Sequence, residues 1–226
     1  MIGPVGFFDS GIGGRSVLDA FRRIAPGERT VYLADTENCP YGNRPEPEIK
    51  RLASACAQKL IAMGCPLVVV ACNTASAAAL EHLRKTFPDT SFVGMEPAVK
   101  PALERTKTKK IAVLATRGTF NGKLYRNTLG RLQGDVTVIE EVADEFVELV
   151  EAGDTSGPNA EKIVAGKIEP LLRADVDQIV LGCTHFPHLK SVIEKIAAGR
   201  AEVVDPSAAV AERARNILEQ IRKQGK

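Results

Sequence analysis

Short apolar runs and longer amphipathic stretches alternate along the whole chain. The apolar runs are rich in β-branched residues, and the amphipathic stretches repeat their apolar positions with the period of a helix. This alternation predicts a parallel sheet with helices on its faces. The predicted strands lie near 5–8, 30–34, 66–71, 91–94, 110–115, 136–140, 177–181 and 202–204. The predicted helices cover 14–24, 47–63, 75–86, 121–132, 144–152, 159–173, 188–198 and 207–223.

The chain contains an internal similarity. Residues 68–74 and 178–185 each carry an aliphatic run that ends at a cysteine and is followed by small hydrogen-bonding residues. The upstream runs at 5–11 and 111–118 are also alike, and each cysteine follows its upstream run at a similar distance, about 63 residues (72 minus 9) and 67 residues (183 minus 116). Similarity at a fixed offset predicts two related halves. Chance is the alternative, because apolar runs ending in glycine are common in α/β proteins.

A crossover between the halves is predicted around 96–101 and the basic run 107–110. The alternative is an ordinary loop on one larger sheet. A chain of 226 residues is long enough for either arrangement.

Composition narrows the class of protein. A hydrophobic content of 44% and a charged content of 26% are typical of a soluble globular protein. The net charge of +2 gives no reason to expect nucleic acid or an anionic membrane as a partner. The apolar runs are too short to span a bilayer, and the first residues lead into a strand without a charged segment. We therefore expect a cytoplasmic protein.

The five cysteines stand at 39, 56, 65, 72 and 183, and no CxxC pair occurs. An odd number without local pairs argues against a disulfide framework and against a structural zinc site. Cys56 and Cys65 fit the role of small buried hydrophobes. Cys72 and Cys183 differ because they stand at the ends of predicted strands.

Reactive or polar residues end five predicted strands, namely Asp9, Asp35, Cys72, Thr116 and Cys183. In doubly wound sheets the ligand binds beyond the carboxyl ends of the strands, so these residues predict the site. The thiols also precede predicted helices, whose N-termini stabilise a thiolate. We therefore expect both thiols to have a stabilised charged form.

Donors beside the thiols suit a carboxylate, because helix N-termini attract anions. They are Asn73, Thr74, Ser76 and Thr184. The alternative is that these residues are plain helix N-caps. The glycine-rich turn at 9–14 resembles a phosphate loop but lacks the lysine of one, so a small carboxylate fits better than a nucleotide.

His185 and Asp9 are candidate acid/base helpers, since each stands near a thiol and histidine titrates close to neutrality. A structural hydrogen bond is the alternative for His185. Zinc held by Cys72, Cys183 and His185 is a further alternative, which lacks the usual local pair of ligands. We expect no metal.

Five motifs together resemble the glutamate racemases of the aspartate/glutamate racemase superfamily. They are FDSGIGG at 8–14, DT at 35–36 with PYG at 40–42, ACNTA at 71–75, LAT at 114–116 with GT at 118–119, and LGCTHFP at 181–187. The resemblance implies a racemase that uses two bases and no cofactor, and that makes D-glutamate for peptidoglycan. It also implies two similar doubly wound α/β domains related by pseudo-two-fold symmetry, with the active site between them. The expected domains are 1–96 plus 206–226, and 97–205.

The resemblance also implies roles for individual residues. Cys72 would remove the α-proton of D-glutamate with help from Asp9, and Cys183 that of L-glutamate with help from His185. Asp35 and Glu151 are further candidate helpers. The residues expected to hold substrate are Asp9, Ser10, Tyr41, Gly42, Asn73, Thr74, Thr116, Thr119, Thr184 and His185.

Other functions remain open at the level of sequence. The substrate could be aspartate or another amino acid. A cysteine hydrolase would need one nucleophile and leaves the second thiol unexplained. A binding protein for amino acids without catalysis is a third alternative. The oligomeric state varies among the proteins that the chain resembles, and a homodimer is one expectation.

Overall fold

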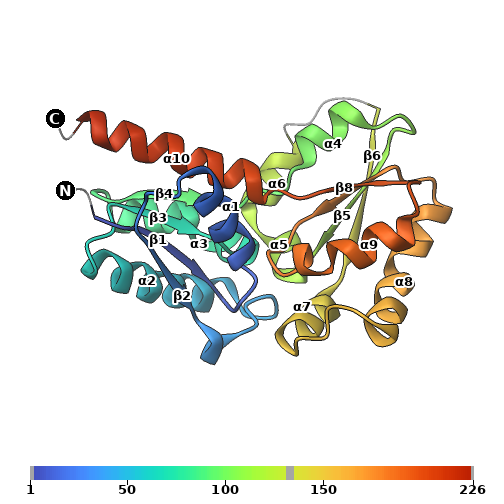
Figure 1. Ribbon diagram of the computed structural model, residues 1–226, viewed down its shortest axis with the longest axis horizontal. Coiled ribbons are helices and arrows are strands. Elements are labelled where there is room, and N and C mark those ends of the chain that lie inside the picture. Colours follow the sequence, from blue (N-terminus) through green and yellow to red (C-terminus); the bar gives the residue numbers. More distant parts are fainter. Residues whose placement is uncertain (1–2, 131–134, 225–226) are drawn as a thin grey trace.

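Two four-stranded parallel sheets form the core of the computed structural model, which describes residues 3–130 and 135–224 (Figure 1). The first sheet has the order β2-β1-β3-β4 and the second the order β6-β5-β7-β8. The first consists of β1 (Val5–Asp9), β2 (Thr30–Ala34), β3 (Leu67–Val70) and β4 (Ser91–Gly94). The second consists of β5 (Lys110–Ala115), β6 (Thr137–Val142), β7 (Gln178–Leu181) and β8 (Glu202–Val204). The shared order confirms the predicted pair of related halves.

Successive residues of the first sheet face opposite layers of helices, as the period of a strand requires. Phe8 of β1 and Val68 and Val70 of β3 pack against one layer, formed by α2 (Glu46–Ala62) and α3 (Asn73–Thr86). Phe7 and Val69 pack on the other face, against α1 (Arg15–Ile24) and α10 (Ser207–Gln224). Because both faces are covered, the strands read as continuous apolar runs.

The second sheet is covered in the same way. One face packs against α7 (Asp144–Glu151), α8 (Pro158–Arg173) and α9 (Lys190–Ala197), and the other against α4 (Val99–Arg105) and α6 (Lys123–Gly130). The short helices η1 (Thr36–Asn38), α5 (Arg117–Asn121) and η2 (Phe186–Leu189) follow the carboxyl ends of β2, β5 and β7. Two layers of helices around each sheet confirm the α/β class.

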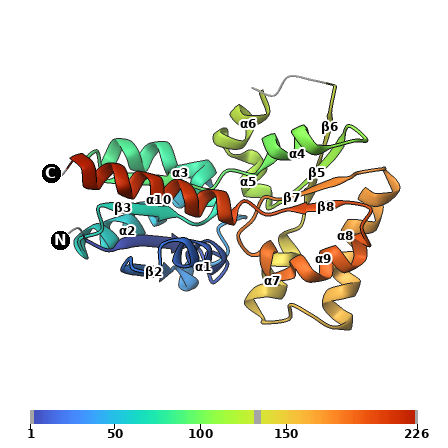
Figure 2. The same ribbon diagram turned by 45° about the horizontal axis from the view of Figure 1, so that its top comes forward.

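The last helix returns to the first sheet (Figure 2). Val210, Ala211, Ala214 and Leu218 of α10 are buried in the same apolar cluster as β1 and β3. We therefore propose the domain division that the sequence suggested, 1–96 plus 206–226 and 97–205, of which residues 1–2, 131–134 and 225–226 lie outside the described residues.

The eight strands are predicted correctly to within two residues at each end, and the helices less well. The helix α4 was not predicted, because Pro101 made this segment resemble a loop. Pro101 occupies the first turn, in which a missing N–H breaks no helical hydrogen bond. The predicted helix 121–132 is replaced by α5 and α6, separated at Gly122, whose backbone is extended. The last two residues of that prediction lie outside the described residues.

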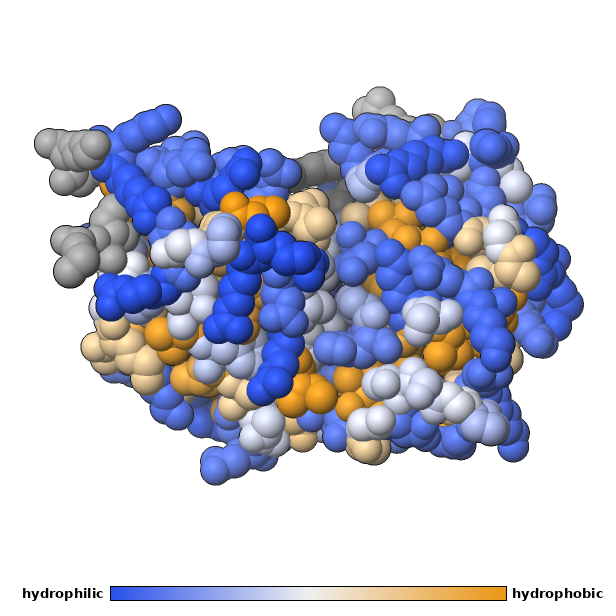
Figure 3. Space-filling model, in the orientation of Figure 1, coloured by the Kyte–Doolittle hydropathy of each residue, from blue (hydrophilic) through white to orange (hydrophobic). Residues whose placement is uncertain are grey.

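Hydrophilic residues cover most of the face seen in Figure 3, with apolar residues scattered between them. Met63 and Ile24 are large hydrophobic side chains with exposed surface. Within residues 3–130 and 135–224, every helix is too short or too polar to cross a membrane.

Candidate active site

The carboxyl ends of the two sheets face each other and bring the predicted residues together. Asp9 ends β1, Cys72 follows β3, Thr116 follows β5 and Cys183 follows β7. None of these side chains is more than 6% exposed. The candidate site is therefore buried between the halves, and each half contributes one thiol.

Cys72 is the N-cap residue of α3. Its Sγ accepts a hydrogen bond of 3.5 Å from the backbone N–H of Ala75, and its thiol donates one of 3.7 Å to Oγ of Ser10. The helix N-terminus stabilises a thiolate as expected, but burial and the neighbouring Asp9 outweigh it and raise the pKa of Cys72 well above its usual range. The net direction of the pKa shift at Cys72 is therefore upward, although the N–H of Ala75 gives the thiolate the stabilisation expected of a helix N-terminus.

Asp9 is fully buried beside Cys72 and is held by backbone donors. Its Oδ2 accepts hydrogen bonds from the N–H groups of Gly11 at 3.2 Å and Gly14 at 3.0 Å. Burial raises the pKa of Asp9, against the lowering effects of His185 and of these hydrogen bonds. A carboxyl with raised proton affinity is suited to accept a proton from the adjacent thiol.

Cys183 has a different set of neighbours. It is followed by the short helix η2 and only then by α9, so its thiol does not cap an α-helix as Cys72 does. Sγ of Cys183 lies 3.8 Å from Nδ1 of His185, and Nε2 of His185 lies 2.5 Å from Oε1 of Glu151. The structure thus aligns thiol, imidazole and carboxylate in one row.

The contacts of His185 with Cys183 and Glu151 favour the protonated form of its imidazole. Burial lowers the pKa of His185, but hydrogen bonds with Cys183, Cys39 and Glu151 outweigh burial and raise it overall. The hydrogen bond with His185 in turn lowers the pKa of Glu151. Cys183 thus has an imidazole as its neighbour, whereas Cys72 has a carboxyl.

The glycine-rich turn after β1 reaches into the opposite half. The N–H of Ile12 donates a hydrogen bond of 2.9 Å to Oε1 of Glu151, and Oγ1 of Thr184 donates one of 3.3 Å to Oδ1 of Asp9. A Cβ atom at Gly13 would lie 2.5 Å from Nδ1 of His185, so a larger residue would force the halves apart. The glycines therefore serve close approach between the domains.

Unpaired polar atoms mark the place for a ligand. Both side-chain polar atoms of Asn73 are buried and have no hydrogen-bond partner among the described residues. Leaving such atoms unpaired is costly, so a polar ligand is the expected partner. Nearby, Thr74 of the first half lies 2.9 Å from Thr116 and 3.3 Å from Thr119 of the second, measured between hydroxyl oxygens. These donors can hold a carboxylate.

Three other predicted residues lie around this space. The hydroxyl of Tyr41 donates a hydrogen bond of 2.5 Å to Asp35, whose other oxygen accepts one from Asn38. A Cβ atom at Gly42 would lie 3.1 Å from Thr116, so the segment that carries Tyr41 touches the second half. The hydrogen bonds of Asp35 therefore go to Tyr41 and Asn38 rather than to a thiol.

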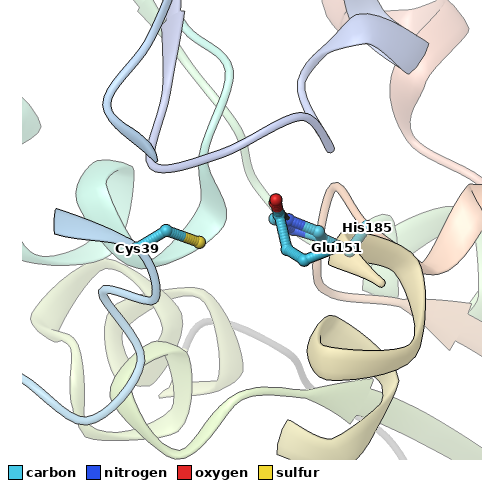
Figure 4. A group of neighbouring side chains, drawn as sticks. All are labelled: Cys39, Glu151 and His185. Carbon is cyan, nitrogen blue, oxygen red and sulfur yellow. Dashed lines mark hydrogen bonds and ion pairs between the residues drawn. The ribbon is translucent and has the colours of Figure 1, made fainter. Parts of the chain in front are cut away.

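The sequence reasoning missed Cys39, which lies beside His185 and Glu151 (Figure 4). No periodicity or spacing could place it there, because it stands in an irregular segment between η1 and Tyr41. The one zinc ligand set that the sequence analysis considered does not form among the described residues. Among the described residues, the ligand atoms of Cys72, Cys183 and His185 do not gather within 4.8 Å of one another.

Known proteins match this chain over most of its length. A family model for Asp/Glu/Hydantoin racemases matches residues 14–214. The glutamate racemase of Roseiflexus sp. (strain RS-1) is 48% identical over 217 residues, which cover 96% of this chain and 80% of that protein.

Solved structures agree with this match. Glutamate racemase of Escherichia coli, in complex with L-glutamate and the activator UDP-MurNAc-ala, has a TM-score of 0.88 and 34% identity over 96% of this chain and 82% of its own. The enzyme of Francisella tularensis, in complex with D-glutamate, has a TM-score of 0.84 and 26% identity over 98% of this chain and 82% of its own.

Proposed function

The chain belongs to the Asp/Glu/Hydantoin racemase family and is an isomerase of the glutamate racemase kind, and we propose that Cys72 and Cys183 are the two acid/base groups with which it interconverts L- and D-glutamate. The observation that carries this assignment is the pair of buried thiols on facing sheet edges, each with its own acid/base neighbour. Supply of D-glutamate to peptidoglycan and a homodimeric state remain predictions.

The two thiols act in opposite senses within one turnover. When L-glutamate is bound, the thiolate of Cys183 takes the α-proton and becomes a thiol, and the thiol of Cys72 gives its proton to the opposite face of the carbanion. When D-glutamate dissociates, Cys72 is a thiolate and Cys183 is a thiol. Proton transfers through Asp9 and His185 then restore the starting state. The reverse reaction begins at Cys72.

The surroundings of the two thiols favour the L-to-D direction. Burial and the neighbouring Asp9 raise the pKa of Cys72, and Cys183 lies 3.8 Å from the imidazole of His185, whose hydrogen bonds outweigh burial and raise its pKa. In the D-to-L direction Cys72 must lose its proton first. The ammonium group of bound substrate brings a positive charge into the site, which lowers the cost of a thiolate at Cys72.

The α-carbanion is far more basic than a thiolate, so the site must stabilise charge by preorganised donors and by excluding water. Asn73 and the hydroxyl groups of Thr74, Thr116 and Thr119 are the donors that we assign to the carboxylates of substrate. Glutamate is the substrate that the relatives support, since two solved glutamate racemases, with TM-scores of 0.88 and 0.84, are in complex with L-glutamate and D-glutamate.

Proton exchange in heavy water tests the proposed function. The purified chain, with no added cofactor, should introduce deuterium at Cα of L- and D-glutamate and convert each into the other. Nuclear magnetic resonance measures the deuterium, and chiral chromatography measures the conversion. Aspartate and alanine in the same assay test the substrate. Failure of both glutamate enantiomers to exchange would contradict racemisation, and faster conversion of aspartate would contradict the choice of glutamate.

Glu151→Gln should impair turnover without abolishing it. Glutamine keeps the size of the side chain but removes the charge that pairs with His185. Loss of one charge-assisted hydrogen bond is worth about 2 kcal/mol, so kcat should fall about 30-fold. KM should change little, because Glu151 acts through His185. Steady-state kinetics with a chelator present measure both constants. A change confined to KM would mean that Glu151 binds substrate instead.

A further inference from the structure

Three metal-ligating side chains from both halves meet at the edge of the site. They are Cys39 from the segment after η1, Glu151 from the end of α7, and His185 from the segment after β7. Their ligand atoms all lie within 4.8 Å of one another. Figure 4 shows the thiol of Cys39 pointing toward the other two side chains from the opposite side of a gap. We call this set the Cys39 cluster.

The Cys39 cluster has the donor types that zinc prefers. A thiolate, an imidazole and a carboxylate bind Zn²⁺ at about 2.3, 2.0 and 2.1 Å, and three protein ligands with one water are a common arrangement. Tetrahedral ligands at such distances are separated by about 3.3 to 3.6 Å. Nε2 of His185 and Oε1 of Glu151 stand closer than this, at 2.5 Å. The two atoms therefore need to move apart by about an ångström for both to bind one ion.

The orientation of His185 is already that of a metal ligand. Its Nε2 faces Glu151, within the cluster, while its Nδ1 faces Cys183 at 3.8 Å. A histidine ligand is usually fixed by a partner on its other ring nitrogen, which sets the tautomer. Cys183 is that partner here.

An ion can reach the Cys39 cluster from solvent. The side chain of Glu151 is 27% exposed, and Cys39 is partly exposed, whereas His185 is buried. The two catalytic thiols are deeper, at 4% and 6% exposure. An incoming ion therefore meets the Cys39 cluster before it meets either catalytic thiol.

We propose that the Cys39 cluster is an inhibitory site for Zn²⁺ or a similar borderline divalent cation. A metal on Nε2 displaces the hydrogen bond between His185 and Glu151 and so removes Glu151 as the partner of the imidazole that faces Cys183. It also links Cys39 of the first domain to His185 of the second, which holds the site closed. The inhibitory effect rests on the proposed function, whereas binding of the ion does not.

Direct binding tests the site. The reduced full-length chain is dialysed against buffered Zn²⁺, and bound metal is measured by atomic absorption for the wild type, Cys39→Ser and Glu151→Gln. Cys65→Ser is the matched control, because that thiol is buried in the core away from the cluster. We expect one ion per wild-type and control chain. Mutation of a residue that only hydrogen-bonds to a metal ligand typically lowers metal affinity by about 10- to 100-fold. Loss of Cys39, which is itself a ligand, should therefore weaken zinc binding by about 100-fold.

Cobalt gives a signature of the thiolate ligand. Co²⁺ bound by the wild type and by Cys65→Ser should show a sulfur-to-metal charge-transfer band, and the band should be missing in Cys39→Ser. Equal zinc affinity and an unchanged band in Cys39→Ser would place the ion on other thiols and overturn the proposal.

Activity connects the site to turnover. Zn²⁺ should inhibit the wild type and the Cys65→Ser control at the concentration that fills the site, and Cys39→Ser should need about 100-fold more, in proportion to its lost affinity. Zinc binding that depends on Cys39 in a chain that never racemises glutamate would refute the proposed function and leave the metal site standing. Racemisation with inhibition that is independent of Cys39 would refute the inhibitory site alone.

Discussion

Cys72→Ser should abolish racemisation and leave deuterium exchange from L-glutamate alone, while Cys183→Ser should leave it from D-glutamate alone. In the proposed mechanism each thiol faces one side of the substrate carbon, and in the structure each is buried with neighbours of its own. A serine hydroxyl is a far weaker acid than a thiol, so the substituted side cannot donate or accept the proton. Removal of a general acid/base group costs up to about 10⁴-fold in rate, and we expect a loss of this size in racemisation.

The measurement is deuterium incorporation at Cα, followed separately for each enantiomer in heavy water. Cys65→Ser is the control, since it removes a buried thiol outside the site and should retain the wild-type rate. Circular dichroism of all three variants verifies the fold. Racemisation at the wild-type rate in either active-site variant would contradict the two-base assignment. Exchange from the wrong enantiomer would reverse the assigned faces.

The positions of the thiols follow from local pattern, and so they could be predicted. Apolar runs define β3 and β7, and in a parallel sheet their carboxyl ends meet at one edge. The sequence repeat then places one thiol in each half. Short sequence patterns are therefore sufficient to predict where the two thiols lie.

The partners of the thiols depend on contacts between distant segments, and the sequence reasoning described them only in part. The contacts of Ile12 with Glu151, and of Cys39 with His185 and Glu151, join segments from different domains. The net direction of the pKa shift at Cys72 is also not visible in the sequence. A helix N-terminus is visible in sequence, whereas complete burial beside Asp9 is not, and burial has the larger effect.

The contrast between the two halves is electrostatic. Cys72 lies beside a carboxyl, and Cys183 lies beside an imidazole that is hydrogen-bonded to Glu151. The two proton transfers should therefore respond differently to the loss of a helper. Substitution of Asp9, the helper of Cys72, gives the clearer test, because asparagine has almost the same shape as aspartate.

Asp9→Asn should slow proton abstraction from D-glutamate by about 10²- to 10³-fold, within the range for loss of a general base. Abstraction from L-glutamate should fall less, because Cys183 and His185 perform that step. The amide oxygen of asparagine can accept the hydrogen bonds from Gly11 and Gly14 that Oδ2 accepts in the wild type. The primary isotope effect with Cα-deuterated D- and L-glutamate measures each direction. Equal losses in both directions would assign Asp9 to substrate binding.

The thermal stability of Asp9→Asn should show whether its loss of activity comes from lost acid/base function or from a disrupted fold. The pKa of Asp9 is raised by burial in the folded state, so its ionised form destabilises the fold at any pH above the pKa of the unfolded chain. Asp177 is the opposite case. Burial raises its pKa, but hydrogen bonds from Thr106, Lys107 and Thr108 outweigh burial and lower it overall. Its carboxylate therefore stabilises the fold above the unfolded pKa, and that stability is lost as the pH falls through the folded pKa.

At pH 7, Asp9→Asn should therefore keep or raise the Tm while losing activity, and Asp177→Asn should lower the Tm while keeping kcat. Asp177 accepts its hydrogen bonds at the amino edge of the second sheet, the edge opposite to the thiols, so its effect is confined to stability. Thermal unfolding followed by circular dichroism measures both Tm values. A marked fall in Tm for Asp9→Asn would show that Asp9 holds the turn at 9–14 in place, and its loss of activity would then be structural.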